Sequence, residues 1–543
     1  PSTDHGRAHG AKGIDDALVA RVPITVHRDD SAWVELHRVV TAGGEAPGRA
    51  TCERAGLTPP PTPPTPPTIP TGPFEDRPVI VVQTRRTEKQ DGRVTAATVE
   101  RVDVPTLAAA GLAALARTTW GACVFSLENS NPPCMVHVIQ TCDDAEHGHA
   151  ARAGIVATTR NVLRGWFSGA ARWVSEGGGK SGNEAREADP PDPIVAFAQE
   201  SCEGVRPLRG LVEAPVMRRD GTIIASPGYD AATRLFAAFD AESAAAALAT
   251  IPDVPTKADA RASLDILHKL VCDFPFEKSA HRATWVAGLL TMLAREMFDG
   301  PAPLFLARAN TRGSGKTLLT ELPHIIACGD RPAMLGWSGD EVEFEKQVTT
   351  EAIAGSACVV IDNITGTFKS ATLDRILTSG KHRARILGGN QKFDGPMRAV
   401  WWASGNNLDT SDDMASRRIA PIELVATDAR PEDRSGFTAD AVEESEEGGS
   451  GEPGTAALRA YARRNRWHLV SAAMTILRAW HCAGRPVPRD LSAWGSFESW
   501  SRVVRGALTG SGYAEYRETG AVCGIELPAG ITDGDLLGEP NYT

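Results

Sequence analysis

The stretch ARANTRGSGKTLL, residues 307–319, holds residue types that bind phosphate groups. Its glycines let backbone N–H groups approach an anion without a Cβ clash, and Lys316 can reach the β- and γ-phosphates of a nucleotide. Thr317 offers a hydroxyl ligand for Mg²⁺. The apolar runs PLFLA before the loop and TLLTELPHIIA after it predict the strand–loop–helix context that this motif requires. We therefore predict a site for ATP and Mg²⁺ that consists of Asn310, Thr311, Arg312, Gly313, Ser314, Gly315, Lys316, Thr317 and Leu318.

Asn310 departs from the usual pattern, which has glycine five positions before Gly315. Asn is the non-glycine residue that best tolerates the left-handed backbone conformation such a position often needs. We therefore expect the loop to keep its function. The alternative is a chance GSGKT in a surface turn, against which the flanking strand and helix patterns argue.

The stretch ACVVIDN, residues 357–363, predicts a buried strand that ends in an acid. We expect Asp362 to hold Mg²⁺ together with Thr317, although an Asp at a strand end can also cap a turn. Asn363 stands where many such ATPases carry a Glu that polarises the attacking water. An amide can orient water but cannot take its proton, so the sequence leaves the hydrolysis rate open.

Two later stretches hold further candidates for catalysis. AVWWASGNN, residues 399–407, predicts a strand whose last residues could orient water beside the γ-phosphate; Asn406 is the first choice and Asn407 the second. DMASRRIAPIEL, residues 413–424, contains Arg417 and Arg418. An arginine from a neighbouring subunit can stabilise the transferring phosphoryl group, which would require an oligomer. A plain turn and a structural salt bridge are the respective alternatives.

A basic hairpin is predicted between the acid strand and the Asn406 strand, because RARIL and KFDGPMRAV flank the turn sequence GGNQ. Local positive charge in an acidic chain is suited to phosphate contacts with DNA. A solvated charged hairpin is the alternative. The candidate DNA-binding residues are Lys381, His382, Arg383, Arg385, Lys392 and Arg398.

Composition bounds the remaining possibilities. The chain has 543 residues, 42% of them hydrophobic and 23% charged, with a formal net charge of −11. This balance excludes a surface that is basic overall, so nucleic acid would have to bind a local patch. No run of 18 apolar residues predicts a membrane span, and the 10 Cys have no disulfide-like spacing, so we expect a cytoplasmic protein.

Changes in composition along the chain predict several domains. The Pro-rich segment 58–73 and the acidic, Gly-rich segment 441–454 are typical of linkers. Alternating strand and helix patterns in 301–430 predict an α/β core. The expected parts are a remnant at 1–57, a linker at 58–74, an α+β accessory domain at 75–193, a mostly helical collar at 194–300, an ATPase core at 301–430, a linker at 431–454 and a helical domain at 455–543.

The order of phosphate loop, VVIDN, basic hairpin, ASGNN and Arg pair resembles superfamily 3 and poxvirus-type primase–helicases of the AAA+ class. The stretches 204–236, 273–295 and 494–508 are similar to helicase-like proteins of bacterial phages and integrative elements. This resemblance implies an AAA+ (P-loop NTPase) core with an α+β N-terminal accessory domain and a helical C-terminal region. It also implies a hexameric ring whose hairpins, residues 381–398, grip single-stranded or forked DNA.

Three weaker signals stay open. KGIDD, residues 12–16, is similar to the end of Toprim-like primase domains, so we expect a missing primase-type domain or a chance helix start. CMVHVIQTCDDAEHGH offers the zinc-ligand types Cys134, His137, Cys142, His147 and His149, but their spacing matches no compact zinc finger. RAYARRNRWHLV, residues 459–470, could contact nucleic acid or pack on the ATPase domain as an accessory helix.

These features together predict an ATP-dependent helicase or translocase that acts in the replication of a phage or mobile element. One alternative is an AAA+ remodeller or loader that acts on protein partners. The other is a module that assembles when it binds ATP and hydrolyses it weakly.

Overall fold

The computed structural model describes residues 77–511, apart from 91–92, 129, 141–152, 177–184, 312, 333, 386–391, 407, 411–417, 427–454 and 488–493. The chain divides into two units, residues 1–68 and 69–543, and every described residue belongs to the second. The segments predicted at 1–57, 58–74 and 431–454 therefore lie outside the described residues.

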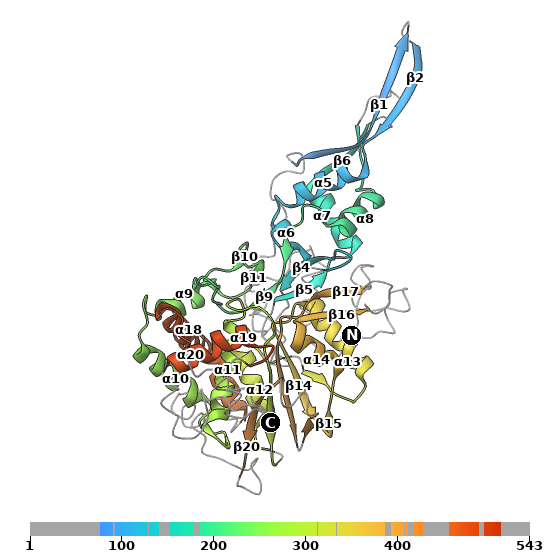
Figure 1. Cartoon of the computed structure of the whole chain (residues 1–543). Helices are drawn as coiled ribbons and strands as arrows, with labels where there is room; N and C mark the ends of the chain where they lie inside the picture. The colour runs from blue at the N-terminus through green and yellow to red at the C-terminus, as the bar shows by residue number, and fades with distance from the viewer. Residues whose placement is uncertain are drawn as a thin grey trace, which may run out of the picture. The chain divides into compact units, whose positions relative to one another are not determined.

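Five parallel strands form the central sheet, in the order β13-β14-β18-β12-β20 (Figure 1). Strand β18 lies between β12 and β14, so the loops after these three strands meet at one edge of the sheet. This mixed α/β arrangement confirms the parallel sheet that the sequence predicts. The strands are β12 (Leu304–Ala309), β13 (Met334–Gly336), β14 (Cys358–Ile364), β18 (Val400–Asn406) and β20 (Ile419–Leu424).

The inner strands are continuous apolar runs, as expected for strands covered on both faces. In β18 every residue but Asn406 is buried. Trp402 of β18 stacks on Phe305 of β12 with ring centroids 4.9 Å apart. Helix α11 (Ser279–Leu293) lies directly against these rings, because a Cβ on its Gly288 would come within 2.2 Å of Trp402.

Helix α11 is buried on all sides, which explains why its sequence is apolar around the whole helix. On one side it contacts β12, β18 and β20, and it also packs against α18 (Arg466–Cys482). The indole N–H of Trp500 donates to Thr291 Oγ1 at 2.8 Å, and that of Trp285 donates to the Leu319 carbonyl at 2.9 Å. The C-terminal helices thus complete the core of the sheet region.

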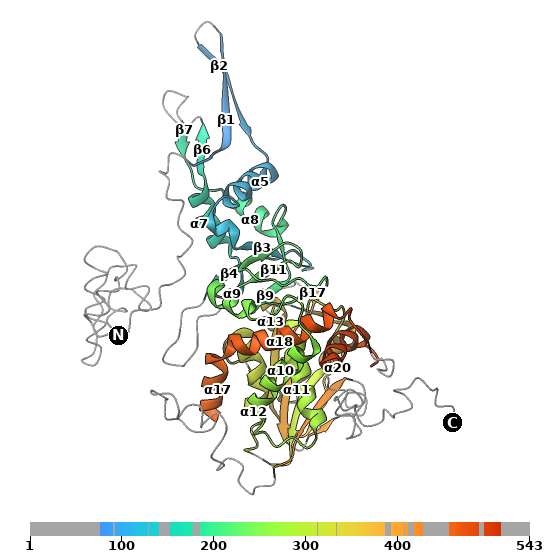
Figure 2. The same ribbon diagram turned by 90° about the vertical axis from the view of Figure 1, so that its left-hand side faces the viewer.

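A separate core organises the first described segments (Figure 2). Leu163, Phe167, Trp173 and Val195 are among its buried residues. Its sheet has the order β2-β1-β6-β7. A second sheet has the order β5-β4-β3-β8, and its strands β3, β4 and β5 lie between β2 and β6 in the chain. The elements are β1 (Val79–Gln90), β2 (Arg93–Arg101), α5 (Val104–Leu115), α6 (Thr119–Ala122), β3 (Val124–Leu127), β4 (Met135–Gln140), β5 (Ala153–Ala157), α7 (Arg160–Ala170), β6 (Arg172–Glu176), β7 (Ala185–Glu187) and α8 (Asp192–Ser201).

Residues 207–237 form short strands, which differs from the mostly helical collar predicted for 194–300. Gly and Pro recur throughout this stretch and interrupt any helical pattern. Strand β8 (Pro207–Leu208) joins β3, and β9 (Gly210–Val212), β10 (Gly228–Asp230) and β11 (Leu235–Ala237) make a small sheet. Helices begin again with α9 (Ala241–Ala249) and α10 (Lys257–Leu270).

The remaining elements surround the central sheet. Helix α12 (Lys316–Cys328) follows β12, and an antiparallel hairpin of β16 and β17 precedes β18. The others are α13 (Glu341–Ala354), β15 (Thr367–Phe368), α14 (Ala371–Ser379), β16 (Lys381–Arg385), β17 (Lys392–Pro396), β19 (Asp409–Thr410), α17 (Thr455–Arg464), α19 (Glu498–Trp500), a π-helix η3 (Ser501–Arg505) and α20 (Gly506–Gly510). Across the described ranges, no helix has both the length and the apolar character needed to cross a bilayer.

Three arginines of RAYARRNRWHLV bind helix α12 or the turn that follows it, so this segment packs against α12 as an accessory helix (Figure 2). Arg459 donates to Glu321 Oε2 at 2.6 Å, and Arg463 donates to Asp330 Oδ1 at 2.6 Å. Arg466 donates to the carbonyls of Ile326 and Ala327 at the end of α12, at 3.0 and 3.1 Å. A cation there also complements the helix dipole.

Glu321→Ala should lower the free energy of unfolding by about 3 kcal/mol, because it breaks a buried ion-pair cluster. The Glu321 side chain is 0% exposed and binds both Arg459 and Arg331. Chemical denaturation followed by Trp fluorescence measures this loss. Glu343→Ala removes the same side chain from an exposed pair with Lys346 and should change stability by no more than about 0.5 kcal/mol. Equal losses in both variants would contradict the prediction.

Candidate functional site

The glycine-rich loop 310–315 connects the carboxyl end of β12 to the first turn of α12. Gly313 and Gly315 have φ of 74° and 87°, a conformation that glycine adopts without strain. A Cβ at Gly315 would also lie 2.9 Å from the Phe274 ring. No side chain caps the start of α12 and no acid lies in its first turn, so its N–H groups can bind an anion.

Lys316 places a nearly buried ammonium group above this helix start. The residue is 8% exposed, and its Nζ donates to the Thr311 carbonyl and to Ser314 Oγ, both at 3.3 Å. Burial lowers the pKa of Lys316, and the charge of Asp362 partly opposes this effect. Among the described residues the close contacts of Lys316 Nζ are with a carbonyl and a hydroxyl, and Asp362 acts on it only from beyond ion-pair distance, so a bound anion would stabilise its charge further.

Asp362 lies at the carboxyl end of β14 and meets side chains from two neighbouring elements. Its Oδ1 accepts from Thr317 Oγ1 at 3.0 Å and from Ser404 Oγ at 2.5 Å. Ser404 is buried in β18, between the strands that carry the loop and the acid. A hydroxyl and a carboxylate at this separation can both bind one divalent cation through oxygen. The structure thus brings together the two residues predicted as metal ligands.

Asn310 occupies its position for a different reason from the one the sequence indicated. It is not among the described non-glycine residues with positive φ. Its side-chain amide instead binds the backbone of Ala426, with Nδ2 donating to the carbonyl at 3.2 Å and Oδ1 accepting from the N–H at 3.1 Å. Glycine could not make these contacts, which attach the loop to the segment after β20.

Asn363 adopts the left-handed conformation that was expected at 310. Its φ is 53°, and the pairing of β14 with β18 changes register between Ile361 and Ile364. Its N–H donates to Ser404 Oγ at 3.4 Å, while the residue as a whole is exposed. Its role towards water stays a prediction.

Asn406 ends β18 and lies opposite Ala309, the last residue of β12. Its Oδ1 is buried and has no hydrogen-bond partner in the described part of the chain. A buried amide oxygen without a partner costs free energy, so this atom fits a site that another molecule completes. Asn407, the second choice, and Arg312 lie outside the described residues.

Arg418 lies at the opposite edge of the sheet from the glycine-rich loop. Its carbonyl accepts from the N–H of Leu304, the first residue of β12. A strand of this length spans about 20 Å, so Arg418 is remote from the loop of its own chain. Its side chain binds Thr378 Oγ1 at 3.1 Å and Asp374 Oδ1 at 3.5 Å. Arg417 lies outside the described residues.

The basic hairpin has one exposed and one buried face. Lys381, Arg383, Arg385 and Lys392 are all exposed, and Arg383 pairs with Asp394 at 3.4 Å. The tip, residues 386–391, lies outside the described residues.

Two residues predicted to bind DNA turn inward. His382 is 0% exposed and its Nε2 lies 2.8 Å from Thr349 Oγ1, because alternate residues of a strand face opposite sides. Arg398 follows the hairpin and binds Glu296. Neither placement fits the DNA contact predicted for these two residues.

Some functional positions had no separate signal in the sequence. Ser404 lies within the apolar strand β18 and Phe274 in the turn between α10 and α11, and only the packing shows that they contact the candidate site. Leu318 is buried and can contribute only its backbone. Of the zinc-ligand candidates, the structure describes Cys134 and His137, and in the ranges it covers no three or more His, Cys, Asp or Glu side chains form a group that could hold a metal ion. Cys142, His147 and His149 lie outside them.

Comparison with known proteins gives short or distant similarities. No family model matches the chain. Phosphoribosylaminoimidazole-succinocarboxamide synthases of Leifsonia xyli subsp. xyli and Chromobacterium violaceum are 66% and 61% identical to it over 41 residues. Each match covers 8% of this chain and 14% of the synthase, so the chain spans about one seventh of these relatives.

Two solved structures align with parts of this chain at low structural similarity. The apo structure of the NrS-1 C-terminal region aligns over 64% of this chain and 65% of that one, with a TM-score of 0.31 and 10% identity. The X-ray structure of JCV helicase aligns over 51% and 73%, with a TM-score of 0.22 and 12% identity.

Asn310→Gly should lower the free energy of unfolding by about 1–2 kcal/mol, although it restores the usual loop pattern, because both contacts with Ala426 are lost. Denaturation of the purified chain without ligand measures this effect. Asn363→Gly is the matched control: its side chain is exposed and its φ suits glycine, so we expect a change within about 0.5 kcal/mol. An Asn310→Gly variant that is more stable than the wild type would contradict the stabilising role of the contacts between Asn310 and Ala426.

Proposed function

We propose that this chain is a P-loop ATPase of the AAA+ class that moves along single-stranded DNA, in the manner of primase–helicases. One observation carries the nucleotide part of this proposal. Four polar side chains lie at the carboxyl edge of the sheet, around three neighbouring strands. Helix α12, which follows β12, carries Lys316 and Thr317; β14 carries Asp362, which binds Thr317; and β18 ends with Asn406. A triphosphate with its cation needs this combination of positive charge, oxygen ligands and a polar amide.

The residues fit Mg-ATP on physical grounds. Lys316 has no carboxylate partner within the described residues, and the first turn of α12 presents open N–H groups. Gly313 and Gly315 leave the backbone accessible. Thr317 and Asp362 would hold Mg²⁺, and Lys316 would bind the phosphates.

The chain's own groups would contribute mainly positioning and charge. Lys316 and the loop N–H groups would orient the phosphates, and the buried amide of Asn406 would orient water. When bound, Mg²⁺ neutralises charge on the transferring phosphoryl group. Asn363 cannot take a proton from water, so hydrolysis by this chain would depend on geometry more than on a general base.

The hairpin supports DNA as the second ligand. Four exposed basic residues on one short hairpin form a local positive surface on a chain of net charge −11. Arg418 is remote from its own nucleotide loop, so this arginine could act only on the nucleotide site of a neighbouring subunit. We therefore propose a ring-shaped oligomer, and the resemblance to phage and mobile-element proteins favours a hexamer that acts in their replication. The synthase activity is no part of the proposal, since that match covers 14% of the synthase.

Asn363 favours a second candidate, a module that assembles when it binds ATP and hydrolyses it only weakly. The exposed amide at this position offers no carboxylate for activating water. Oligomerisation that depends on ATP, with no phosphate release at any DNA concentration, would support this candidate. An AAA+ remodeller of proteins would instead hydrolyse ATP at the same rate with and without DNA.

Lys316→Ala should reduce ATP hydrolysis by at least about 100-fold, or about 3 kcal/mol in barrier height, because it removes the charge that binds the phosphates. Phosphate release measures the rate, and equilibrium binding of ATP measures the affinity. Lys346→Ala removes an exposed lysine from α13 and should leave both unchanged. If the wild-type chain has no measurable affinity for ATP, the proposed function fails.

Lys392→Ala should weaken binding of single-stranded DNA and the stimulation of hydrolysis by that DNA. The slope of log affinity against log salt should fall by about 0.7, the value for one phosphate contact on a single strand. Fluorescence anisotropy at several salt concentrations measures the slope. Lys346→Ala again serves as the control for loss of one positive charge. An unchanged slope in Lys392→Ala would exclude this hairpin face as the contact.

A further inference from the structure

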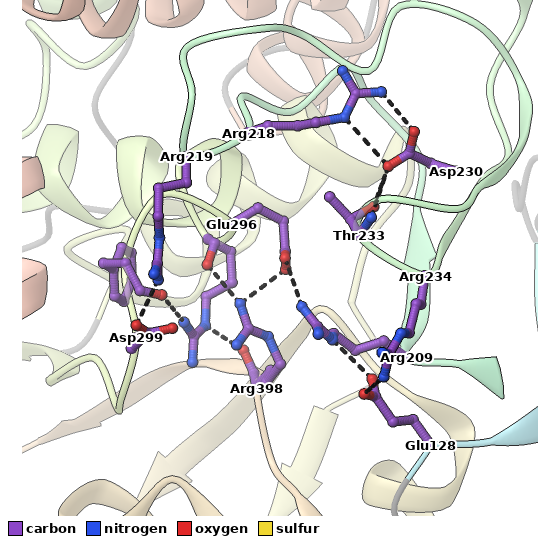
Figure 3. A network of polar contacts seen from close by, with 12 residues as sticks. Glu128, Arg209, Arg218, Arg219, Asp230, Thr233, Arg234, Glu296, Asp299 and Arg398 are labelled. Atoms are coloured by element: carbon purple, nitrogen blue, oxygen red, sulfur yellow. Dashed lines mark hydrogen bonds and ion pairs between the residues drawn. The ribbon is translucent and has the colours of Figure 1, made fainter.

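Glu296 lies at the centre of a polar network that joins three regions of the chain (Figure 3). It follows α11, and its side chain is 7% exposed. One carboxylate oxygen accepts from Arg398 at 2.8 Å, and the other accepts from Arg209 at 3.0 Å. A single carboxylate thus bridges the base of the basic hairpin and the small sheet that follows β8.

The contact with Arg398 is reinforced by the backbone. Arg398 donates to the Arg295 carbonyl at 2.7 Å, and Arg295 donates in return to the Arg398 carbonyl at 2.9 Å. The N–H groups of Met397 and Val400 bind the carbonyls of Gly380 and Ala357. Met397, Arg398 and Val400 are therefore each hydrogen-bonded to a distant part of the chain.

The contact with Arg209 extends the network to the first described segments. Arg209 also donates to Glu128 Oε2 at 2.9 Å, and Arg234 donates to Glu128 Oε1 at 2.5 Å. Glu128 follows β3 and its side chain is 11% exposed. Burial would raise the pKa of Glu128, but the two guanidiniums bring it below its ordinary value, which keeps the carboxylate charged.

Glu296 is the member whose loss would unbalance the network most. Without it, Arg209 and Arg398 would lie close together with no shared carboxylate (Figure 3), and the positive charge of Arg295 also acts on both. Like charges that are only partly exposed to water repel one another strongly. The segment between hairpin and strand β18 would then lose its fixed position relative to α11.

This segment is the direct covalent path from the hairpin to the candidate nucleotide site. It begins where β17 ends, at Pro396, and β18 runs from Val400 to Asn406. A displacement of the hairpin is transmitted to Asn406 only if this segment is rigid enough to move together with β18. Coupling between two sites requires such an element, on which both sites act.

We propose that Glu296 is a positioning residue that couples DNA bound on hairpin β16–β17 to hydrolysis at the glycine-rich loop. The inference rests on the proposed function. Because Glu296 contacts neither ligand, it acts through Arg398 and leaves the nucleotide site itself intact.

Glu296→Gln tests this role, because it keeps the size of the side chain and removes its charge. Hydrolysis without DNA should stay within 2-fold of wild type, as should the KM for ATP, whereas stimulation by saturating single-stranded DNA should fall at least 5-fold. Asp299→Asn is the control: it removes a carboxylate paired with Arg219 at the exposed margin of the network and should keep full stimulation. Thermal melting of both variants checks that they are folded.

Arg398→Lys provides a second variant should Glu296→Gln not fold. Lysine keeps the positive charge but lacks the planar fork of donors, so stimulation should again fall while basal hydrolysis persists. Full stimulation in either folded variant, or an equal loss of basal and stimulated rates, would overturn the inference alone. A wild-type chain that hydrolyses ATP without any response to DNA would overturn both the inference and the motor function.

Discussion

The hydrogen bond between Thr317 and Asp362 depends on strand order, and the candidate site depends on that bond. Thr317 follows β12 and Asp362 lies near the carboxyl end of β14, yet these strands are not neighbours, because β18 lies between them. Ser404 of β18 contacts the same carboxylate oxygen and so fills the intervening space. With another strand order, the loop and the acid would lie too far apart to share a cation.

The candidate site differs from other buried charged positions in what its charged group contacts. Glu321, Asp330 and Glu296 each bind one or more arginines, which compensates the cost of removing a carboxylate from water. Within the part of the chain that the structure describes, Lys316 has only a carbonyl and a hydroxyl as close partners. A buried cation in this situation is most stable when an anion binds, so the same physical rule that explains the structural ion pairs singles out Lys316 as functional.

Arginine clusters hold the elements around the sheet in place. Those of α17 and α18 attach the C-terminal helices to α12, the helix that carries Lys316, and those around Glu296 attach the base of the hairpin to α11. Both clusters act on elements that run directly into the candidate site. The basic residues that stay exposed, such as Lys381 and Lys392, are therefore distinct from those that stabilise the fold.

The sequence by itself determined the strand–loop–helix around Lys316, the acid strand of Asp362 and the strand ending at Asn406, because local apolar patterns and glycine positions specify these elements without distant contacts. It could not determine why Asn stands at 310, which way His382 and Arg398 point, or what the arginines of 459–466 bind. Those outcomes depend on partners such as Ala426, Thr349, Glu296 and Glu321, which lie far away in the chain. The short strands of 207–237 likewise exist because β3 and their own neighbours supply hydrogen bonds that no local pattern reveals.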